Sequence, residues 1–369
     1  MRIHPMSPEN GANGANGANG ANGANGANGA NGANGANGAN SLWAYSAWQP
    51  NPGLTYSLDA SREALVRAQD LAKLSHQVLV DKKPTALRPQ RVADAAVARC
   101  DPTTRLHLLA TELLEGMAVA KVSGALDEAQ LLFGQYPLLT LKRPDEQFFG
   151  MQLLRVLAWQ PVRADRSTEI VTQVNPQYAY WASVCRLHPE TTPRTIELTY
   201  LALHWSMLLT QRLKLLIDAL RPNERSHLVQ PLLLTPAYSA LPSGHATEAF
   251  VFMRVMSALQ PKSRSQLTRL ADRIAINRVV AGLHYPVDGA AGRVTAEVLA
   301  DVFLARAGFA GCASVQQRSF SVAGLGLPGD WDQPPSQVTL DTSAAGSPVQ
   351  ISVEPTLKWL AEQARGEWS

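Results

Sequence analysis

Three short segments in the second half of the chain bring together cations, histidines and a carboxylate. They are Lys214 with Arg221-Pro222, spaced as K-x6-R-P; Pro242-Ser243-Gly244-His245; and Arg278, His284 and Asp288, spaced as R-x5-H-x3-D. Three cations suit a tetrahedral oxyanion that carries two or three negative charges. One histidine could attack or ligate the central atom while the other moves a proton. The three segments together therefore predict an oxyanion site.

The first pair stands near the end of a predicted long helix. Seven residues turn a helix by about 700°, roughly 20° short of two turns, so Lys214 and Arg221 are expected on nearly the same face. Pro222 is expected to stop the helix and leave Arg221 at its open end. Taken alone, the pair is more typical of a solvated basic helix face.

The second segment precedes an amphipathic helix. A Ser243-Gly244 turn there leaves backbone N–H groups without helical acceptors, at the positive end of the helix dipole. Such a helix start can bind an anion. Taken alone, the segment is more typical of a Ser243 helix cap with His245 on the surface.

In the third segment His284 precedes Asp288 by one helical turn. The carboxylate can accept the hydrogen bond of one imidazole nitrogen, which makes the other nitrogen more nucleophilic. Pro286 predicts a helix start beside them. A local histidine–aspartate cap pair is an equally good explanation of this segment by itself.

Hydrophobic periodicity predicts helices through most of the chain. The expected helices run from Ser57 or Asp59 to Val80, and over 103–121, 146–159, 193–220, 246–259, 263–282 and 286–307. Residues 324–348 are rich in Gly, Pro, Ser and Asp and predict a loop, and 337–353 suits short strands or extended loop. The predicted fold class is all-α, a helical bundle.

Residues 11–40 repeat Gly-Ala-Asn ten times, without the prolines of collagen and with nothing large to bury. We expect a disordered spacer without chemistry. The predicted organisation is a disordered N-terminal segment over 1–50, a helical domain over 51–310 with the motifs in 195–307, and a loop-rich C-terminal extension over 311–369.

Composition excludes several function classes. The 33 Lys and Arg exceed the 30 Asp and Glu by too little for a nucleic-acid partner. Three widely spaced cysteines suit a reducing compartment. No signal peptide is visible, and the longest uncharged helical stretch, Leu198–Gln211, has 14 residues where a bilayer needs about 20. We expect a cytoplasmic protein without a membrane span; no pattern sets its oligomeric state.

The three spacings match, at every defining position, the motifs of the type 2 phosphatidic acid phosphatase and vanadium haloperoxidase superfamily. The resemblance covers about Thr195–Ala307, and the chain most resembles soluble bacterial members. The resemblance implies that the oxygens of phosphate or vanadate bind Lys214, Arg221, Ser243, Gly244 and Arg278.

The resemblance also implies roles for the remaining motif residues. His284 would be the nucleophile that forms a phosphohistidine, or the axial ligand of vanadate. His245 would protonate the leaving group, or serve as acid and base in peroxide activation. Asp288 would orient His284.

Three functions are compatible with these roles. The first hypothesis is hydrolysis of a small phosphoester without a cofactor. The alternative is a vanadate-dependent haloperoxidase that oxidises halide with hydrogen peroxide, and the third is a non-catalytic oxyanion-binding protein. The 33-residue step from His245 to Arg278 resembles acid phosphatases, whereas the long helical region before Thr195 resembles haloperoxidases.

Overall fold

The computed structural model describes residues 96–174, 177–322, 333–338 and 346–368. The Gly-Ala-Asn repeat and the helix predicted from Ser57 or Asp59 to Val80 lie outside these residues. The elements in chain order are α5 (Ala96–Arg99), α6 (Pro102–Leu114), β1 (Met117–Lys121), β2 (Glu128–Phe133), β3 (Tyr136–Lys142), α7 (Glu146–Ala158), α8 (Arg163–Thr172), α9 (Tyr178–Cys185), α10 (Pro193–Ile217), α11 (Pro222–Arg225), α12 (Gly244–Leu259), α13 (Arg264–Val280), α14 (Pro286–Arg306), β4 (Ser314–Val315), β5 (Arg318–Phe320), β6 (Val349–Gln350) and α15 (Pro355–Gly366). Single 3-10 turns, Gln160–Val162 and Pro261–Ser263, precede α8 and α13.

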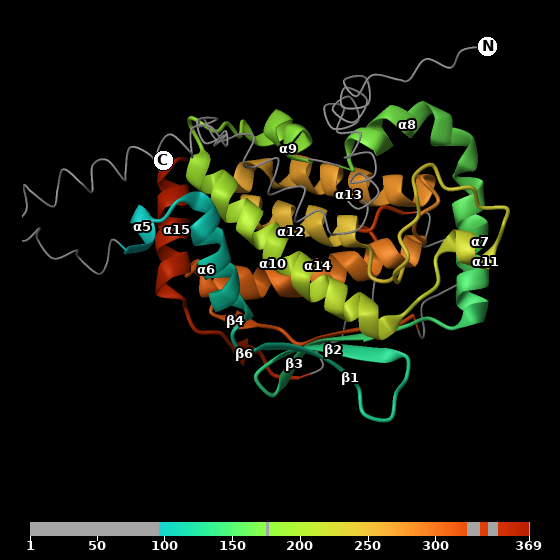
Figure 1. Ribbon diagram of the computed structural model, residues 1–369, viewed down its shortest axis with the longest axis horizontal. Helices are drawn as coiled ribbons and strands as arrows, with labels where there is room; N and C mark the ends of the chain where they lie inside the picture. Colours follow the sequence, from blue (N-terminus) through green and yellow to red (C-terminus); the bar gives the residue numbers. More distant parts are fainter. Residues whose placement is uncertain (1–95, 175–176, 323–332, 339–345, 369) are drawn as a thin grey trace, which may run out of the picture.

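The helices α10, α12, α13 and α14 form the centre of the molecule (Figure 1). α12 packs against the other three. Its consecutive residues Phe250, Val251 and Phe252 are all buried, so this helix has no solvent face in its middle. Because α12 begins at the second motif, the helix that starts beside His245 continues through the centre of the core.

The helices predicted around the motifs agree with the structure within a few residues. Ser243 is the N-cap of α12, and Pro286 occupies the first turn of α14. Pro193 likewise opens α10, but this helix ends at Ile217 rather than at 220. Capping residues and prolines mark helix starts more sharply than the hydrophobic pattern marks helix ends.

The fold is mostly helical, but the all-α prediction is wrong in part. A four-stranded sheet with the order β1-β2-β3-β5 packs against α10 and α14. β1, β2 and β3 pair antiparallel, and β5 pairs parallel to β3. β4 and β6 form a separate antiparallel pair. The helix predicted over 103–121 therefore ends at Leu114, and its last residues belong to β1.

Glycines and burial explain why the strands form and why periodicity misses them. Gly116 has φ +75° and separates α6 from β1. Gly134, with φ +58°, lies in the two-residue turn that joins β2 to β3, a position that favours glycine in hairpins. Leu138 and Leu139 are both buried in β3, so the alternation typical of a half-exposed strand is missing there.

The C-terminal residues belong to the same hydrophobic core as the bundle. α15 buries Leu357 and Leu360 in that core and packs against α10. Glu367 follows α15, and its carboxylate accepts hydrogen bonds from the backbone N–H groups of Arg194 (2.6 Å) and Thr195 (2.8 Å) at the start of α10. The expected loop-rich extension therefore includes a helix that covers one end of the bundle.

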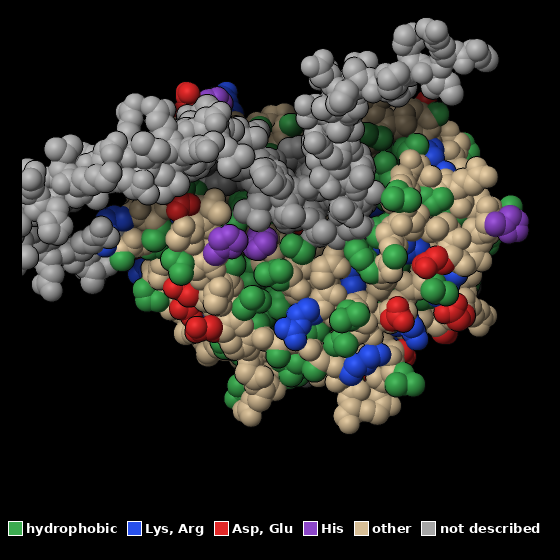
Figure 2. Space-filling view, viewed as in Figure 1, with side chains coloured by type: hydrophobic (Ala, Val, Ile, Leu, Met, Phe, Trp, Pro, Cys, Tyr) green, Lys and Arg blue, Asp and Glu red, His purple; other side chains and the backbone are tan. Residues whose placement is uncertain are grey.

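The surface of the described part mixes charges of both signs. Figure 2 shows Lys and Arg interspersed with Asp and Glu, and with hydrophobic side chains, on the visible face. Among the described helices, none combines the length and the apolar character that crossing a bilayer requires. Within the described residues, three motif cations lie buried in the interior: Lys214, Arg221 and Arg278.

Candidate active site

The end of α10 and the loop after it place Lys214 and Arg221 in the interior, where both are buried. The two residues do not share one continuous helix. Asp218 has a left-handed conformation (φ 50°) that ends α10, and Arg221 is extended (φ −79°, ψ 163°) before α11. The predicted cause of their proximity was therefore wrong, because Pro222 starts the short α11 rather than stopping α10.

The loop between α11 and α12 wraps around these two cations. Lys214 Nζ donates to the carbonyl of Ser239 at 2.9 Å. Arg221 Nε donates to the carbonyl of Tyr238, and Nη1 to the carbonyl of Leu283, both at 2.9 Å. The Tyr238 ring centroid lies 5.4 Å from Lys214 Nζ and 5.3 Å from the Arg221 guanidinium carbon, which indicates cation–π contacts. The backbone carbonyls and one ring thus fix both side chains.

The second motif forms the first turn of α12. Ser243 Oγ accepts a hydrogen bond from the N–H of Ala246 at 3.4 Å, and Ser243 N–H donates to the carbonyl of Asp288 at 2.9 Å. The positive end of α12, with Gly244 and His245, therefore opens beside the start of α14. His245 is buried, and its Nε2 has no hydrogen-bond partner within the described structure.

A glycine allows α14 to approach this turn closely. A Cβ atom at Gly292 would lie 2.8 Å from the carbonyl oxygen of Ser243 and 2.9 Å from the Cβ of Ala246. Any other residue would push the two helices apart. Gly292 thus sets the distance between the second motif and the third.

Asp288 orients the imidazole of His284. Nδ1 of His284 lies 3.0 Å from Asp288 Oδ2, which also accepts the backbone N–H of Tyr285 at 2.9 Å. A carboxylate at Nδ1 places the ring proton there and leaves Nε2 with its lone pair. Nε2 lies 3.5 Å from Nη1 of Arg221. Burial raises the pKa of Asp288 to about 6.

Arg278 supplies the third cation from the last turns of α13. It is fully buried, and burial lowers the pKa of its guanidinium to about 10, so it stays charged at neutral pH. Nη2 donates to the carbonyl of Ile170 at 3.0 Å, whereas Nε and Nη1 have no partner in the part of the chain that the structure describes. A buried donor without an acceptor costs about 1–3 kcal/mol. These donors, with Nε2 of His245, fit an acceptor such as an oxyanion.

The cations also set the protonation of both histidines. Burial, followed by the positive charges of Arg278, Lys214 and Arg221, lowers the pKa of His245 well below its ordinary value. Burial and the same cations lower the pKa of His284 in the same direction. Both rings are therefore neutral near pH 7 in the free protein. A bound dianion would counter the cations and raise both pKa values.

Residues that the sequence did not single out brace the motif loops. Arg225 pairs with Glu146 at 2.7 Å, and its guanidinium carbon lies 4.2 Å from the ring centroid of Phe149. The Phe149 ring in turn lies 5.0 Å from that of Tyr285, next to His284. Arg225 and Glu146 are 79 positions apart, so no local pattern could reveal this contact. Its effect is to connect α7 with the loop that carries His284.

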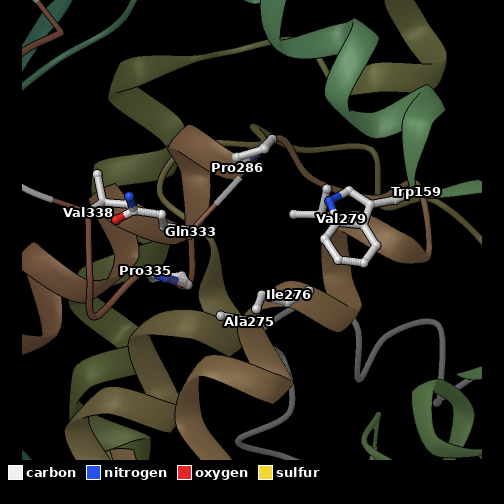
Figure 3. A pocket seen from close by; sticks show the side chains of 9 residues that line it. Trp159, Ala275, Ile276, Val279, Pro286, Gln333, Pro335 and Val338 are labelled. Carbon is white, nitrogen blue, oxygen red and sulfur yellow. The ribbon is translucent and has the colours of Figure 1, made fainter. Parts of the chain in front are cut away.

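Figure 3 shows a small cavity whose lining contains none of the eight predicted site residues. Its lining includes Val279, Pro286 and Gly289, each one or two positions after a motif residue, together with the ring of Trp159. Adjacent helix positions point about 100° apart, so Val279 and Gly289 face another direction than Arg278 and Asp288. Apart from Gln333 its lining side chains lack hydrogen-bonding amides or charges, and it does not suit an oxyanion.

The structure brings together all eight motif residues: Lys214, Arg221, Ser243, Gly244, His245, Arg278, His284 and Asp288. The family model of the PAP2 superfamily matches residues 196–308, a range that includes each of them. No curated protein matches the chain.

Proposed function

Because residues 196–308 belong to the PAP2 superfamily, we propose that this chain is a phosphoric ester hydrolase that acts through a phosphohistidine at His284. The observation that carries the proposal is the 3.0 Å contact of His284 Nδ1 with Asp288, beside three buried cations. An oxyanion-binding protein without catalysis would not need an imidazole whose free nitrogen faces the cations.

In the first step the cations and the start of α12 bind the non-bridging oxygens of the phosphoester. Nε2 of His284 attacks phosphorus and forms a nitrogen–phosphorus bond, while the bond to the leaving oxygen breaks. His245 gives its proton to that oxygen. Asp288 stabilises the positive charge that develops on the His284 ring.

In the second step a water molecule attacks the phosphohistidine. His245, which has lost its proton, accepts one from this water. The nitrogen–phosphorus bond breaks, phosphate leaves, and both histidines return to their starting states.

His245 must be protonated before it can act as an acid, although its pKa is low in the free protein. The bound phosphoester meets this requirement, because its negative charge offsets the cations and so raises the pKa of His245. Substrate binding and proton uptake are therefore coupled in the proposed mechanism.

Vanadate is also a tetrahedral oxyanion, and the unpaired donors of Arg278 and His245 fit it as well as phosphate. Bound there with His284 as its ligand, vanadate would supply peroxide activation for halide oxidation. In the hydrolase that we propose, vanadate is an inhibitor instead.

The test uses the purified chain and aryl phosphates. We expect phosphate release that vanadate inhibits competitively, and loss of this activity in His284→Ala. Stoichiometric retention of vanadium together with peroxide-dependent halide oxidation, without phosphate release, would show that the chain is a haloperoxidase.

A further inference from the structure

α8, a helix outside the motifs and outside the range of the family match, anchors Arg278. Nη2 of Arg278 donates to the carbonyl of Ile170 at 3.0 Å and contacts Oε1 of Gln173 at 3.4 Å. Ile170 lies in the last turn of α8, and Gln173 follows the helix directly. Both precede residue 196, where the match begins.

The carbonyl of Ile170 is available because α8 ends there. In a continuing helix this carbonyl would accept the N–H of Val174, but Val174 N–H donates to Val171 at 3.2 Å. The free carbonyls at a helix end carry the negative end of its dipole, which favours a cation. The end of α8 thus offers Arg278 a neutral acceptor, which binds the guanidinium without cancelling its positive charge.

Gln173 adds a second, neutral acceptor whose orientation is fixed. Its side chain is fully buried. Oε1 also accepts Nδ2 of Asn277 at 2.8 Å, and Nε2 donates to Glu169 at 3.0 Å. Because the amide nitrogen is engaged by a carboxylate, the amide oxygen must face Arg278.

α8 is itself fastened to α13 along its length. Arg273 of α13 pairs with Glu169 at 2.6 Å, and Arg163 Nε donates to the carbonyl of Val280 at 2.7 Å. Ile170 forms a small hydrophobic cluster with Leu283 and its neighbours, separate from the main core. The end of α8 is therefore held against the end of α13 and against Leu283, the residue before His284.

We propose that the end of α8 positions Arg278 for the oxyanion, with Gln173 as a positioning residue. Holding Nη2 leaves Nε and Nη1 buried and without a partner among the described residues, as donors for the substrate. A neutral amide at position 173 puts no negative charge in direct contact with the third cation, whereas the nearby carboxylate of Glu169 is paired with Arg273. This inference rests on the proposed oxyanion site.

The isosteric variant Gln173→Glu tests the charge requirement. Its carboxylate would lie where the amide oxygen now contacts Arg278 and would compete with the oxyanion for this cation. We expect binding of inorganic phosphate, measured by calorimetry, to weaken by about tenfold or more, with kcat/KM falling in parallel. Gln173→Ala keeps the Ile170 anchor and should weaken binding by a smaller factor.

A matched control is Gln130→Ala, which removes an amide that donates to Thr140 in the sheet at 3.1 Å. Its phosphate affinity should equal that of the wild type. In an Arg278→Ala background, Gln173→Ala should cause no further loss, because its effect passes through the guanidinium. A general structural effect would add to that of Arg278→Ala.

Two failures are distinguishable. The first is that the wild-type chain binds phosphate and the Gln173→Glu variant, shown to be folded by its melting temperature, binds phosphate equally well. In that case α8 does not position Arg278, and the inference is wrong. If the wild type itself binds neither phosphate nor vanadate, the proposed function fails and the inference fails with it.

Discussion

Asp288 holds the Nδ1 side of the His284 ring at 3.0 Å, and the same carboxylate oxygen binds the backbone of Tyr285. The ring orientation and the loop conformation thus depend on one oxygen atom. Asp288→Asn can keep the backbone contact through its amide oxygen, but it removes the negative charge that stabilises the positive charge developing on the His284 ring. We expect turnover to fall by about 100-fold.

The measurement is single-turnover hydrolysis quenched in alkaline denaturant, because the nitrogen–phosphorus bond of a phosphohistidine is acid-labile, followed by detection of labelled protein. Asp288→Asn should form labelled protein slowly, whereas His284→Ala should form none. Labelling of His284→Ala would place the nucleophile elsewhere.

His245 should matter most for substrates with poor leaving groups. Such substrates need the proton in the transition state, whereas an acidic phenol departs without it. His245→Ala should therefore retain part of its activity on aryl phosphates of acidic phenols and lose nearly all of it on alkyl phosphates. A uniform loss across a series of graded leaving groups would contradict the role of His245 as proton donor.

Anion binding should be accompanied by proton uptake. The pKa of both histidines is lowered by burial and by the cations, so both rings are neutral in the free protein above their ordinary pKa of about 6.5. A bound dianion raises these pKa values, so binding strengthens as pH falls toward them.

Sulfate is the suitable probe because its charge is constant over this range. We expect sulfate affinity to rise by up to about tenfold per pH unit for each proton taken up, between about pH 8 and pH 6.5, above the titration of Asp288 near 6. His245→Gln should show a smaller slope. A wild-type affinity independent of pH would contradict the coupling.

The arginines should not be replaceable by lysine. Arg221 uses Nε and Nη1 for two carbonyls, and Arg278 uses Nη2 for another, so each needs several donors in fixed directions. Arg221→Lys and Arg278→Lys should each lower kcat/KM by well over tenfold. The exposed Arg264→Lys is the control and should behave as the wild type. Near-full activity in either site variant would show that this arginine is not part of the proposed site.

The sequence predicted which residues lie together better than it predicted how they are held. Spacing identified Lys214 and Arg221 as partners, but the predicted geometry assumed one continuous helix. In the structure a left-handed Asp218 ends α10, and the carbonyls of Tyr238 and Leu283, from two different loops, hold Arg221. Local pattern shows which residues can do chemistry, whereas tertiary contacts decide how they are held.

The missed elements have physical causes as well. α8 is short and mostly polar, and its value lies in contacts with Arg278 more than 100 positions away. The sheet is short-stranded, and adjacent buried leucines hide its alternation. By contrast, α12 and α14 were predicted closely because Ser243 and Pro286 mark their starts.

Gly292 offers a test of how α14 and α12 hold the second motif. A Cβ atom there would meet the carbonyl oxygen of Ser243 at 2.8 Å and the Cβ of Ala246 at 2.9 Å, and the first of these is backbone that cannot rotate away. Gly292→Ala should therefore lower the free energy of unfolding by about 1–3 kcal/mol. It should also reduce activity by more than this loss of folded protein explains, because the start of α12 must shift away from His284.

Gly150→Ala is the matched control for this substitution. Gly150 lies on the exposed side of α7, and an added Cβ would meet nothing within 4 Å. Removing a helical glycine there should stabilise the protein by about 0.5–1 kcal/mol and leave turnover unchanged. Chemical denaturation and steady-state kinetics of the two variants provide the comparison. If Gly292→Ala were as stable and as active as Gly150→Ala, the close approach of α14 would not be what positions Ser243 and His245.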